Sequence, residues 1–163
     1  MLYFASMPLD LSDFDDVKTK AEELYKTLAA VECPYFKDKV YFNAQGLEHL
    51  KFKRHGKARI QQDQYMRIKL LYLAPKILRV TTTLQGIWAT KSFEKVRVHN
   101  RSDMIMRDVE YYEFVAILQE KRVRIIVKRI GDGQKFFWSI IPHWRLDERT
   151  SIRKMHTGSP EDD

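Results

Sequence analysis

The first half of the chain carries apolar residues at helical spacing. In residues 9–31, LDLSDFDDVKTKAEELYKTLAAV, they recur every three or four positions behind Ser12 or Asp13, both typical N-cap residues. The pattern predicts a helix that Pro34 brings to an end. The segment KVYFN is typical of a short strand, and it leads through Asn43 into a second helix. A third helix is predicted over 61–74, because Pro75 ends or kinks the pattern.

The second half changes from helical spacing to alternation. Four strands are predicted from ILRVTTTLQGIWAT, VEYYEFVAIL, RVRIIVKRI and KFFWSIIPHW, and the turn Gly131-Asp132-Gly133 predicts a hairpin between the last two. Residues 92–108 favour a longer loop or an added short strand. Helices followed by an antiparallel meander predict an α+β fold, in which N-terminal helices pack on one face of a four-stranded or slightly larger antiparallel sheet.

Length and charge narrow the picture further. A chain of 163 residues suits one domain, which we place at 1–145, followed by a polar, flexible tail at 146–163. The single cysteine, Cys33, excludes an internal disulfide and suits a small buried side chain in a cytoplasmic protein. We expect neither a signal peptide nor a membrane span. A net charge of +7 makes a polyanion the first partner to consider.

Alternation along the last two strands sorts the side chains of the sheet. In RVRIIVKRI, the valines and Ile125 are expected to face the helices, which turns Arg124 and Lys128 to the second face. In the last strand Trp138 is a better core residue than Ser139. The second face should therefore carry Arg124, Lys128, Ser139 and His143, beside Tyr112 or Glu113. A single bulge in the last strand would reverse its assignments.

A dense basic stretch, GLEHLKFKRHGKAR at 46–59, spans the second predicted helix and the segment after it. It fits either a solvated surface or contact with an RNA backbone, and its density favours RNA. Arg67 in the third helix is a further candidate, although it could instead pair with Asp63 or Glu113. The predicted RNA-binding residues are Lys51, Lys53, Arg54, His55, Lys57, Arg59 and Arg67.

These residues include the groups needed to cleave RNA without a metal. A base removes the proton of a 2′-hydroxyl, an acid protonates the leaving 5′-oxygen, and cations or hydroxyls hold the phosphate. Histidine suits both proton transfers, since its usual pKa is about 6.5. His49, however, lies between two leucines and also fits a packed residue, and His143 also fits a cap of the last strand. The spacing of Cys, His and acids predicts no metal site, and no cofactor motif is present.

The chain resembles the barnase, EndoU, colicin and RelE (BECR) ribonuclease superfamily, and most of all its phage and mobile-element toxin branches. The resemblance rests on KVYFNAQGLEHL, RIKLLYLAPKIL, VEYYEFVAIL, RVRIIVKRI and KFFWSIIP, and it covers roughly residues 36–143. It implies a small ribonuclease toxin fold with a histidine near the second helix, basic residues on central strands and Ser or Thr in the last strand before a proline. His49, Lys128 and Ser139 match these positions.

The function predicted from the sequence is a metal-independent endoribonuclease toxin that leaves a 2′,3′-cyclic phosphate. His49 and His143 would transfer protons, Lys128 and Arg124 would stabilise the phosphorane, and Ser139 would orient the phosphate. The resemblance implies a cognate antitoxin, whose acidic surface would cover the cationic face. The alternative is a non-catalytic RNA-binding or protein-interaction module of a mobile element, with aromatic residues that stack on bases.

Overall fold

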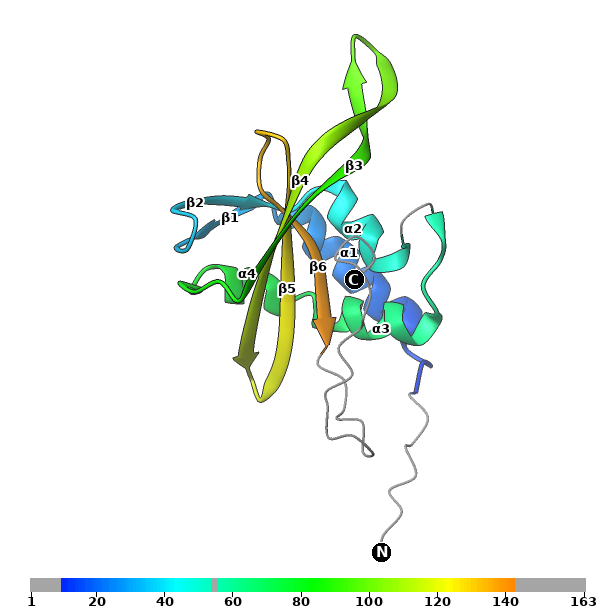
Figure 1. Ribbon diagram of the computed structural model, residues 1–163. Coiled ribbons are helices and arrows are strands. Elements are labelled where there is room, and N and C mark those ends of the chain that lie inside the picture. Colours follow the sequence, from blue (N-terminus) through cyan, green and yellow to red (C-terminus); the bar gives the residue numbers. More distant parts are fainter. Residues whose placement is uncertain (1–9, 54–55, 143–163) are drawn as a thin grey trace, which may run out of the picture.

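The computed structural model describes residues 10–53 and 56–142, and within these ranges the chain forms four helices and six strands (Figure 1). In chain order they are α1 (Phe14–Thr27), β1 (Ala30–Cys33), β2 (Asp38–Tyr41), α2 (Ala44–Lys51), α3 (Gln61–Leu70), α4 (Leu73–Leu78), β3 (Gly86–Val98), β4 (Arg101–Leu118), β5 (Lys121–Ile130) and β6 (Phe136–Pro142). The predicted α+β class is confirmed.

The sheet is larger than predicted and is mixed. Its order is β1-β2-β6-β5-β4-β3, and its pairs are antiparallel except β2 and β6, which run parallel and meet at Tyr41 and Phe136. The prediction that the first helix continues toward Pro34 was wrong. The helix ends at Thr27, and β1 pairs with β2, because Val31 and Cys33 alternate with exposed Glu32 and point into the core. Burial also raises the pKa of the Cys33 thiol.

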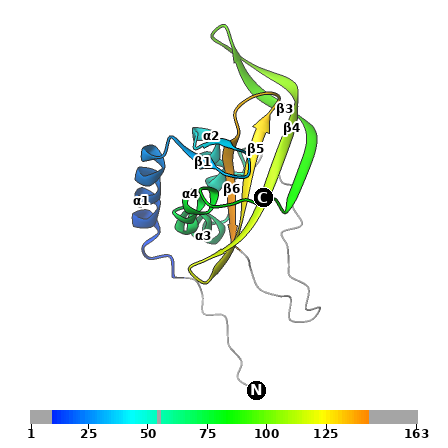
Figure 2. The same ribbon diagram turned by 90° about the vertical axis from the view of Figure 1, so that its left-hand side faces the viewer.

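The helices cover one face of the sheet, as Figure 2 shows. The main core lies between the two layers; there Phe42 stacks on Phe137 with ring centroids 5.2 Å apart, and Phe36 meets the rings of Tyr112 and Phe114 edge to face. The predicted inward positions of Val123, Ile125 and Val127 on β5 are confirmed, since all three belong to this core. We call the opposite side of the sheet the helix-free face, because no helix of residues 10–53 and 56–142 lies on it.

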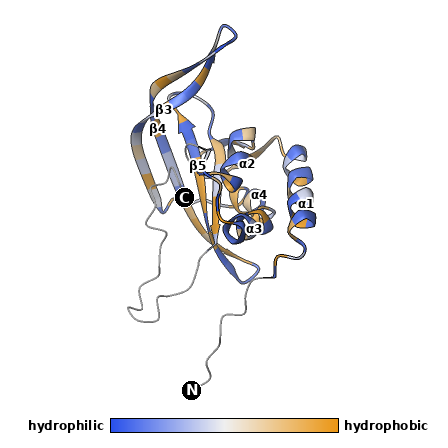
Figure 3. Cartoon of the chain, turned by 90° about the vertical axis from the view of Figure 1, so that its right-hand side faces the viewer, coloured by the Kyte–Doolittle hydropathy of each residue, from blue (hydrophilic) through white to orange (hydrophobic). Residues whose placement is uncertain are grey.

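Of the two alternatives predicted for residues 92–108, a longer loop or an added short strand, the segment takes the strand conformation and forms no long loop. Strands β3 and β4 continue through the segment and turn at His99 and Asn100, whose φ angles of 47° and 64° have the sign that a tight two-residue hairpin turn requires. Since β4 pairs with β5 only from Val109 onward, residues 91–108 pair only with each other in the sheet and form a hairpin arm beyond its body (Figure 1). The arm is largely hydrophilic and carries separate hydrophobic patches (Figure 3).

Helix α2 lies directly against strand β6, and this contact places the functional site. Asn43 caps the helix by accepting a hydrogen bond from the backbone N–H of Gly46, at 3.2 Å. A Cβ atom at Gly46 would lie 2.2 Å from the carbonyl oxygen of Phe137, so only glycine allows so close an approach. Tyr25 of α1 donates a hydrogen bond of 2.6 Å to the Asn43 carbonyl and fixes the start of the helix from the other side.

A bulge in β6 changes which of its residues face the helices. The pairing with β5 shifts between Ile126 and Val127, so that Ile126 opposes Ser139 while Val127 opposes Phe137, and Trp138 is the extra residue. Phe137 therefore joins the main core, and Trp138 packs with a smaller cluster on the helix-free face. The prediction that Trp138 faces the core was wrong, because strict alternation does not survive an inserted residue.

Candidate functional site

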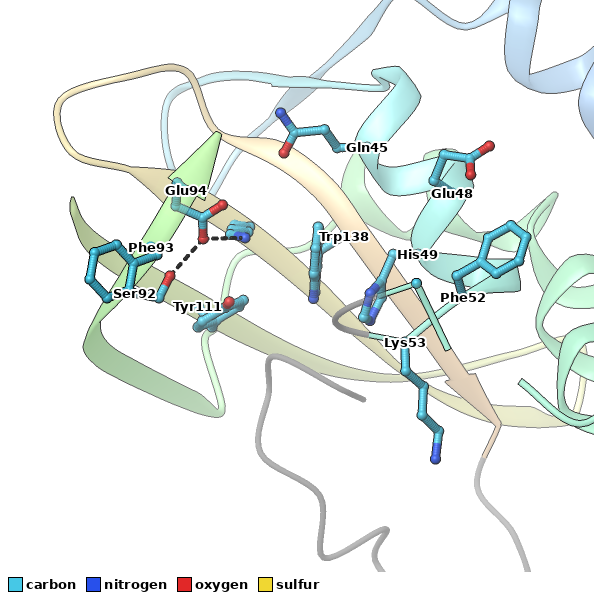
Figure 4. A pocket seen from close by; sticks show the side chains of 12 residues that line it. Gln45, Glu48, His49, Phe52, Lys53, Ser92, Phe93, Glu94, Tyr111 and Trp138 are labelled. Atoms are coloured by element: carbon cyan, nitrogen blue, oxygen red, sulfur yellow. Dashed lines mark hydrogen bonds and ion pairs between the residues drawn. The ribbon is translucent and has the colours of Figure 1, made fainter. Parts of the chain in front are cut away.

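One pocket of about 340 Å³ lies where α2, the root of the hairpin arm and the helix-free face meet. Its lining brings together two of the predicted catalytic residues, His49 from α2 and Lys128 from β5. Figure 4 shows the Trp138 ring with His49 on one side of it and Tyr111 and Glu94 on the other. The full lining is Gln45, Glu48, His49, Phe52, Lys53, Gly56, Ser92, Phe93, Glu94, Tyr111, Lys128 and Trp138.

A buried ion pair lies at the base of this pocket. The Lys128 Nζ atom is 2.8 Å from Glu94 Oε1, and the lysine side chain is only 4% exposed. Ser92 donates a hydrogen bond of 2.7 Å to the same carboxylate oxygen. Glu94 and Ser92 both come from the hairpin arm, so the arm supplies a carboxylate that binds Lys128. The predicted position of Lys128 on the helix-free face is confirmed.

Aromatic rings surround the ammonium group of Lys128. Its Nζ lies 4.0 Å from the centroid of the Trp138 ring and 5.5 Å from that of Tyr111, both within the range of a cation–π contact. The imidazole of His49 stacks on the same indole, with centroids 3.9 Å apart and planes inclined by 21°. Lys128, Trp138 and His49 are therefore one packed unit that joins β5, β6 and α2.

Arg59 lies behind His49 and not on the surface. The prediction that it contacts RNA from an exposed position conflicts with its burial, since the side chain is 1% exposed. Its Nε donates a hydrogen bond of 2.9 Å to the His49 carbonyl oxygen, and its Nη2 lies 2.9 Å from His49 Nε2. A further contact of 3.4 Å joins Nη1 to Asp63. The position of Arg59 is set by His49 and Asp63.

Asp63 extends this network to strand β6. It accepts a hydrogen bond of 2.8 Å from Arg67 Nε, and Arg67 Nη1 donates one of 2.7 Å to the hydroxyl of Ser139. Arg67 and Ser139 are both fully buried and neither lines the pocket. Ser139 lies opposite Ile126 of the helix-free face, as the predicted face assignment requires, but its hydroxyl is buried and bound by Arg67. A surface position for Arg67 was wrong. The structural alternative for Arg67, a pair with Asp63, is confirmed.

The remaining predicted residues lie apart from the pocket or outside the described ranges. Arg124 is on the helix-free face as expected, where its guanidinium binds both carboxylate oxygens of Glu113, at 3.1 and 2.8 Å. Lys51 pairs with Glu22 of α1 at 2.9 Å. Lys57 is exposed, and Lys53 is exposed at the pocket. The predictions for Arg54, His55 and His143 concern residues outside the described ranges.

The sequence analysis missed Glu94, Ser92 and Trp138 as site residues. Glu94 and Ser92 were missed because 92–108 was left open between a loop and a short strand. The alternation of KVRV before His-Asn, a dipeptide that tolerates a tight turn, was the available signal for a hairpin. Trp138 was assigned to the core on its size.

Two searches of the described residues give negative results. No group of three His, Cys, Asp or Glu side chains within 10–53 and 56–142 could hold a metal ion. Over the same ranges, no helix has both the length and the apolar content to cross a membrane. Comparison with known proteins found no matching family model, curated protein or solved structure.

Proposed function

We propose that the pocket binds and cleaves RNA, and that the protein is an endoribonuclease that needs no metal. One observation carries the proposal: His49 and Lys128, which are far apart in the sequence, line one pocket together with the carboxylate of Glu94 and four aromatic side chains. The exposed Lys53 stands at the same pocket and extends its positive charge outward, toward a polyanion. The resemblance to BECR ribonucleases supports the same reaction class.

The reaction would be an internal transesterification. Glu94 takes the proton of a 2′-hydroxyl, the freed oxygen attacks the adjacent phosphorus, and the bond from phosphorus to the 5′-oxygen breaks. The products are a 2′,3′-cyclic phosphate and a 5′-hydroxyl, which takes its proton from solvent. Protonation of Glu94 neutralises its carboxylate and so ends the ion pair with Lys128. The ammonium group can then stabilise the negative charge that develops on the phosphorane.

The aromatic residues suit the binding of a single-stranded substrate. Phe52 and Phe93 line the pocket, and their side chains are 37% and 57% exposed. Exposed rings beside a cationic site are how proteins stack unpaired bases while they hold the phosphate chain. A free ribonuclease endangers its own cell, so a partner protein with an acidic surface that covers the pocket belongs to this proposal as the antitoxin.

The test compares the wild type with Lys128→Met and Lys121→Met in excess EDTA, with total RNA as substrate. Lys121 lies on the same strand but contacts Tyr72 away from the pocket. We expect cleavage with 2′,3′-cyclic phosphate ends by the wild type and Lys121→Met, and a loss of at least about 100-fold for Lys128→Met. The double variant Lys128→Met/Glu94→Gln avoids an unpaired buried carboxylate and should be equally inactive. Full activity of that double variant would refute the assignment.

A second candidate function, RNA binding without cleavage, is favoured by a different observation. Both groups predicted for catalysis are engaged in the structure, Lys128 by Glu94 and the Nε2 atom of His49 by Arg59. In that case RNA would remain intact in the same experiment, and its binding would weaken steeply with salt and with the loss of Lys53 or Phe93.

A further inference from the structure

Arg59 contacts His49 at two points, the backbone carbonyl and the imidazole ring. Its Nε donates to the backbone carbonyl of His49 and its Nη2 lies 2.9 Å from the ring atom Nε2, so a single planar guanidinium spans the backbone and the side chain of one residue. The backbone contact fixes where the guanidinium sits relative to α2. The ring contact is therefore geometrically determined, and Asp63 holds the other end of the guanidinium at 3.4 Å.

The chemistry of the two groups decides the direction of the ring contact. A guanidinium has only N–H donors and stays charged at every pH at which the protein is folded. The Nε2 atom of His49 must then be the acceptor, which requires a lone pair on that nitrogen. An imidazole that accepts at Nε2 is neutral and carries its proton on Nδ1.

Stacking on Trp138 restricts rotation of the His49 ring away from Arg59. The two rings are nearly parallel at 3.9 Å, and the His49 side chain is 4% exposed. A half-turn of the imidazole about its Cβ–Cγ bond would put the Cε1 atom where Nε2 lies and break the contact with Arg59. The other charged groups around the ring are Lys128, which shares the indole, and Glu48 and Lys53, which line the same pocket.

We propose that Arg59 is a positioning residue that holds His49 as the neutral Nδ1–H tautomer. His49 then serves the pocket as a stacked wall and, because its Nε2 lone pair accepts from Arg59, it is not the group that removes the 2′-hydroxyl proton. The tautomer stands on the contacts alone. Only this last consequence rests on the proposed function, and it leaves Glu94 as the base.

The test reads the tautomer directly. In protein labelled with ¹⁵N-histidine, long-range proton–nitrogen correlation at pH about 8, where an ordinary imidazole is neutral, shows which ring nitrogen carries the proton. His49→Gln assigns the signal. We expect the Nδ1–H pattern in the wild type and a shift toward Nε2–H in Arg59→Lys, which keeps the charge but cannot span both contacts. Arg67→Lys, which alters the same network without touching His49, should leave the pattern unchanged.

An Nε2–H pattern in the wild type would overturn the inference, and this holds even if Arg59→Lys does not fold. Cleavage assays separate it from the proposed function. If His49 is the Nδ1–H tautomer and RNA stays intact, the inference about Arg59 holds and the proposed ribonuclease activity is refuted. If the wild type cleaves RNA and His49 is the Nε2–H tautomer, the ribonuclease activity holds and the inference is refuted. If both hold, Arg59→Lys should lower kcat by about tenfold or more while KM changes little.

Discussion

The two faces of the sheet bury different kinds of side chain. On the helix-covered face the main core is apolar, with aromatic rings such as Phe42 and Phe137 packed against each other, and the buried arginine Arg67 is bound by Asp63 of its own helix. On the helix-free face two buried cations are each held by a carboxylate, Lys128 by Glu94 and Arg124 by Glu113. Buried ion pairs contribute little net stability, because desolvation offsets their attraction. The comparison indicates that one face holds the fold and the other holds charge in place.

Two neighbours on β6 allow the sharpest test of this difference. Phe137 is fully buried against Phe42 and Tyr25, whereas Trp138 is half-buried against His49 and Lys128. We expect Phe137→Ala to lower the free energy of unfolding by about 3 to 5 kcal/mol, the usual cost of a large core cavity. Trp138→Ala should cost about 2 kcal/mol at most, since part of the ring remains in solvent. Urea unfolding measures both.

The RNA cleavage or binding proposed for the pocket should be affected more by Trp138→Ala than by Phe137→Ala. The Trp138→Ala protein loses the surface on which His49 and Lys128 rest, so RNA cleavage or binding should fall by about tenfold or more while the protein stays folded. Phe137→Ala should retain RNA activity in whatever fraction remains folded. A Trp138 variant that is less stable than the Phe137 variant would contradict the division between the faces.

The contact of α2 with β6 gives a smaller expected effect that links the two faces. In Gly46→Ala, the new Cβ would meet the Phe137 carbonyl at 2.2 Å and the Tyr25 hydroxyl at 2.6 Å. Helix α2 must move outward, so we expect a loss of about 1 to 3 kcal/mol, as for an overpacked site. Adding Tyr25→Phe removes the hydroxyl but not the carbonyl. Urea unfolding of the double variant should therefore show no recovery, and a full recovery would place the obstruction at Tyr25.

The helix-covered face could be predicted well from the sequence. Helical spacing located α1, α2 and α3, and alternation placed Val123, Ile125 and Val127 toward the helices. These patterns are reliable because burying an apolar side chain is favourable wherever the partner lies. There were two exceptions. The four residues of β1 follow directly after a helix and were too few to be distinguished from the helical pattern before them, and Ile77 and Leu78, which were predicted to begin a strand, end helix α4 instead.

The pocket could be predicted only in part. His49 and Lys128 were found because each stands out in its own element, whereas their partners depend on long-range geometry. Glu94 contacts Lys128 because the hairpin arm folds back toward β5, and Trp138 lies at the pocket because of the bulge in β6. Arg59 follows α2 in the sequence and contacts it because the chain turns back toward that helix. A local pattern contains no information about such returns. The polar partners of a site are consequently harder to predict than its apolar neighbours.

The smallest effect concerns Lys51, which was predicted to contact RNA and instead joins α2 to α1. Its hydrogen bond with Glu22 lowers the pKa of that carboxyl below its usual value. The pair should therefore stabilise the fold by about 0.5 to 1 kcal/mol above the ordinary glutamate pKa, and this contribution should disappear as the pH falls through the lowered value. Urea unfolding of the wild type, Lys51→Met, Glu22→Gln and the double variant isolates the coupling at pH 7 and at pH about 3. Coupling that persists at the lower pH would show that Lys51 stabilises through its aliphatic chain.

RNA binding unaffected by Lys51→Met but weakened by Lys53→Met would locate the functional charge at the pocket, and not along the whole basic stretch.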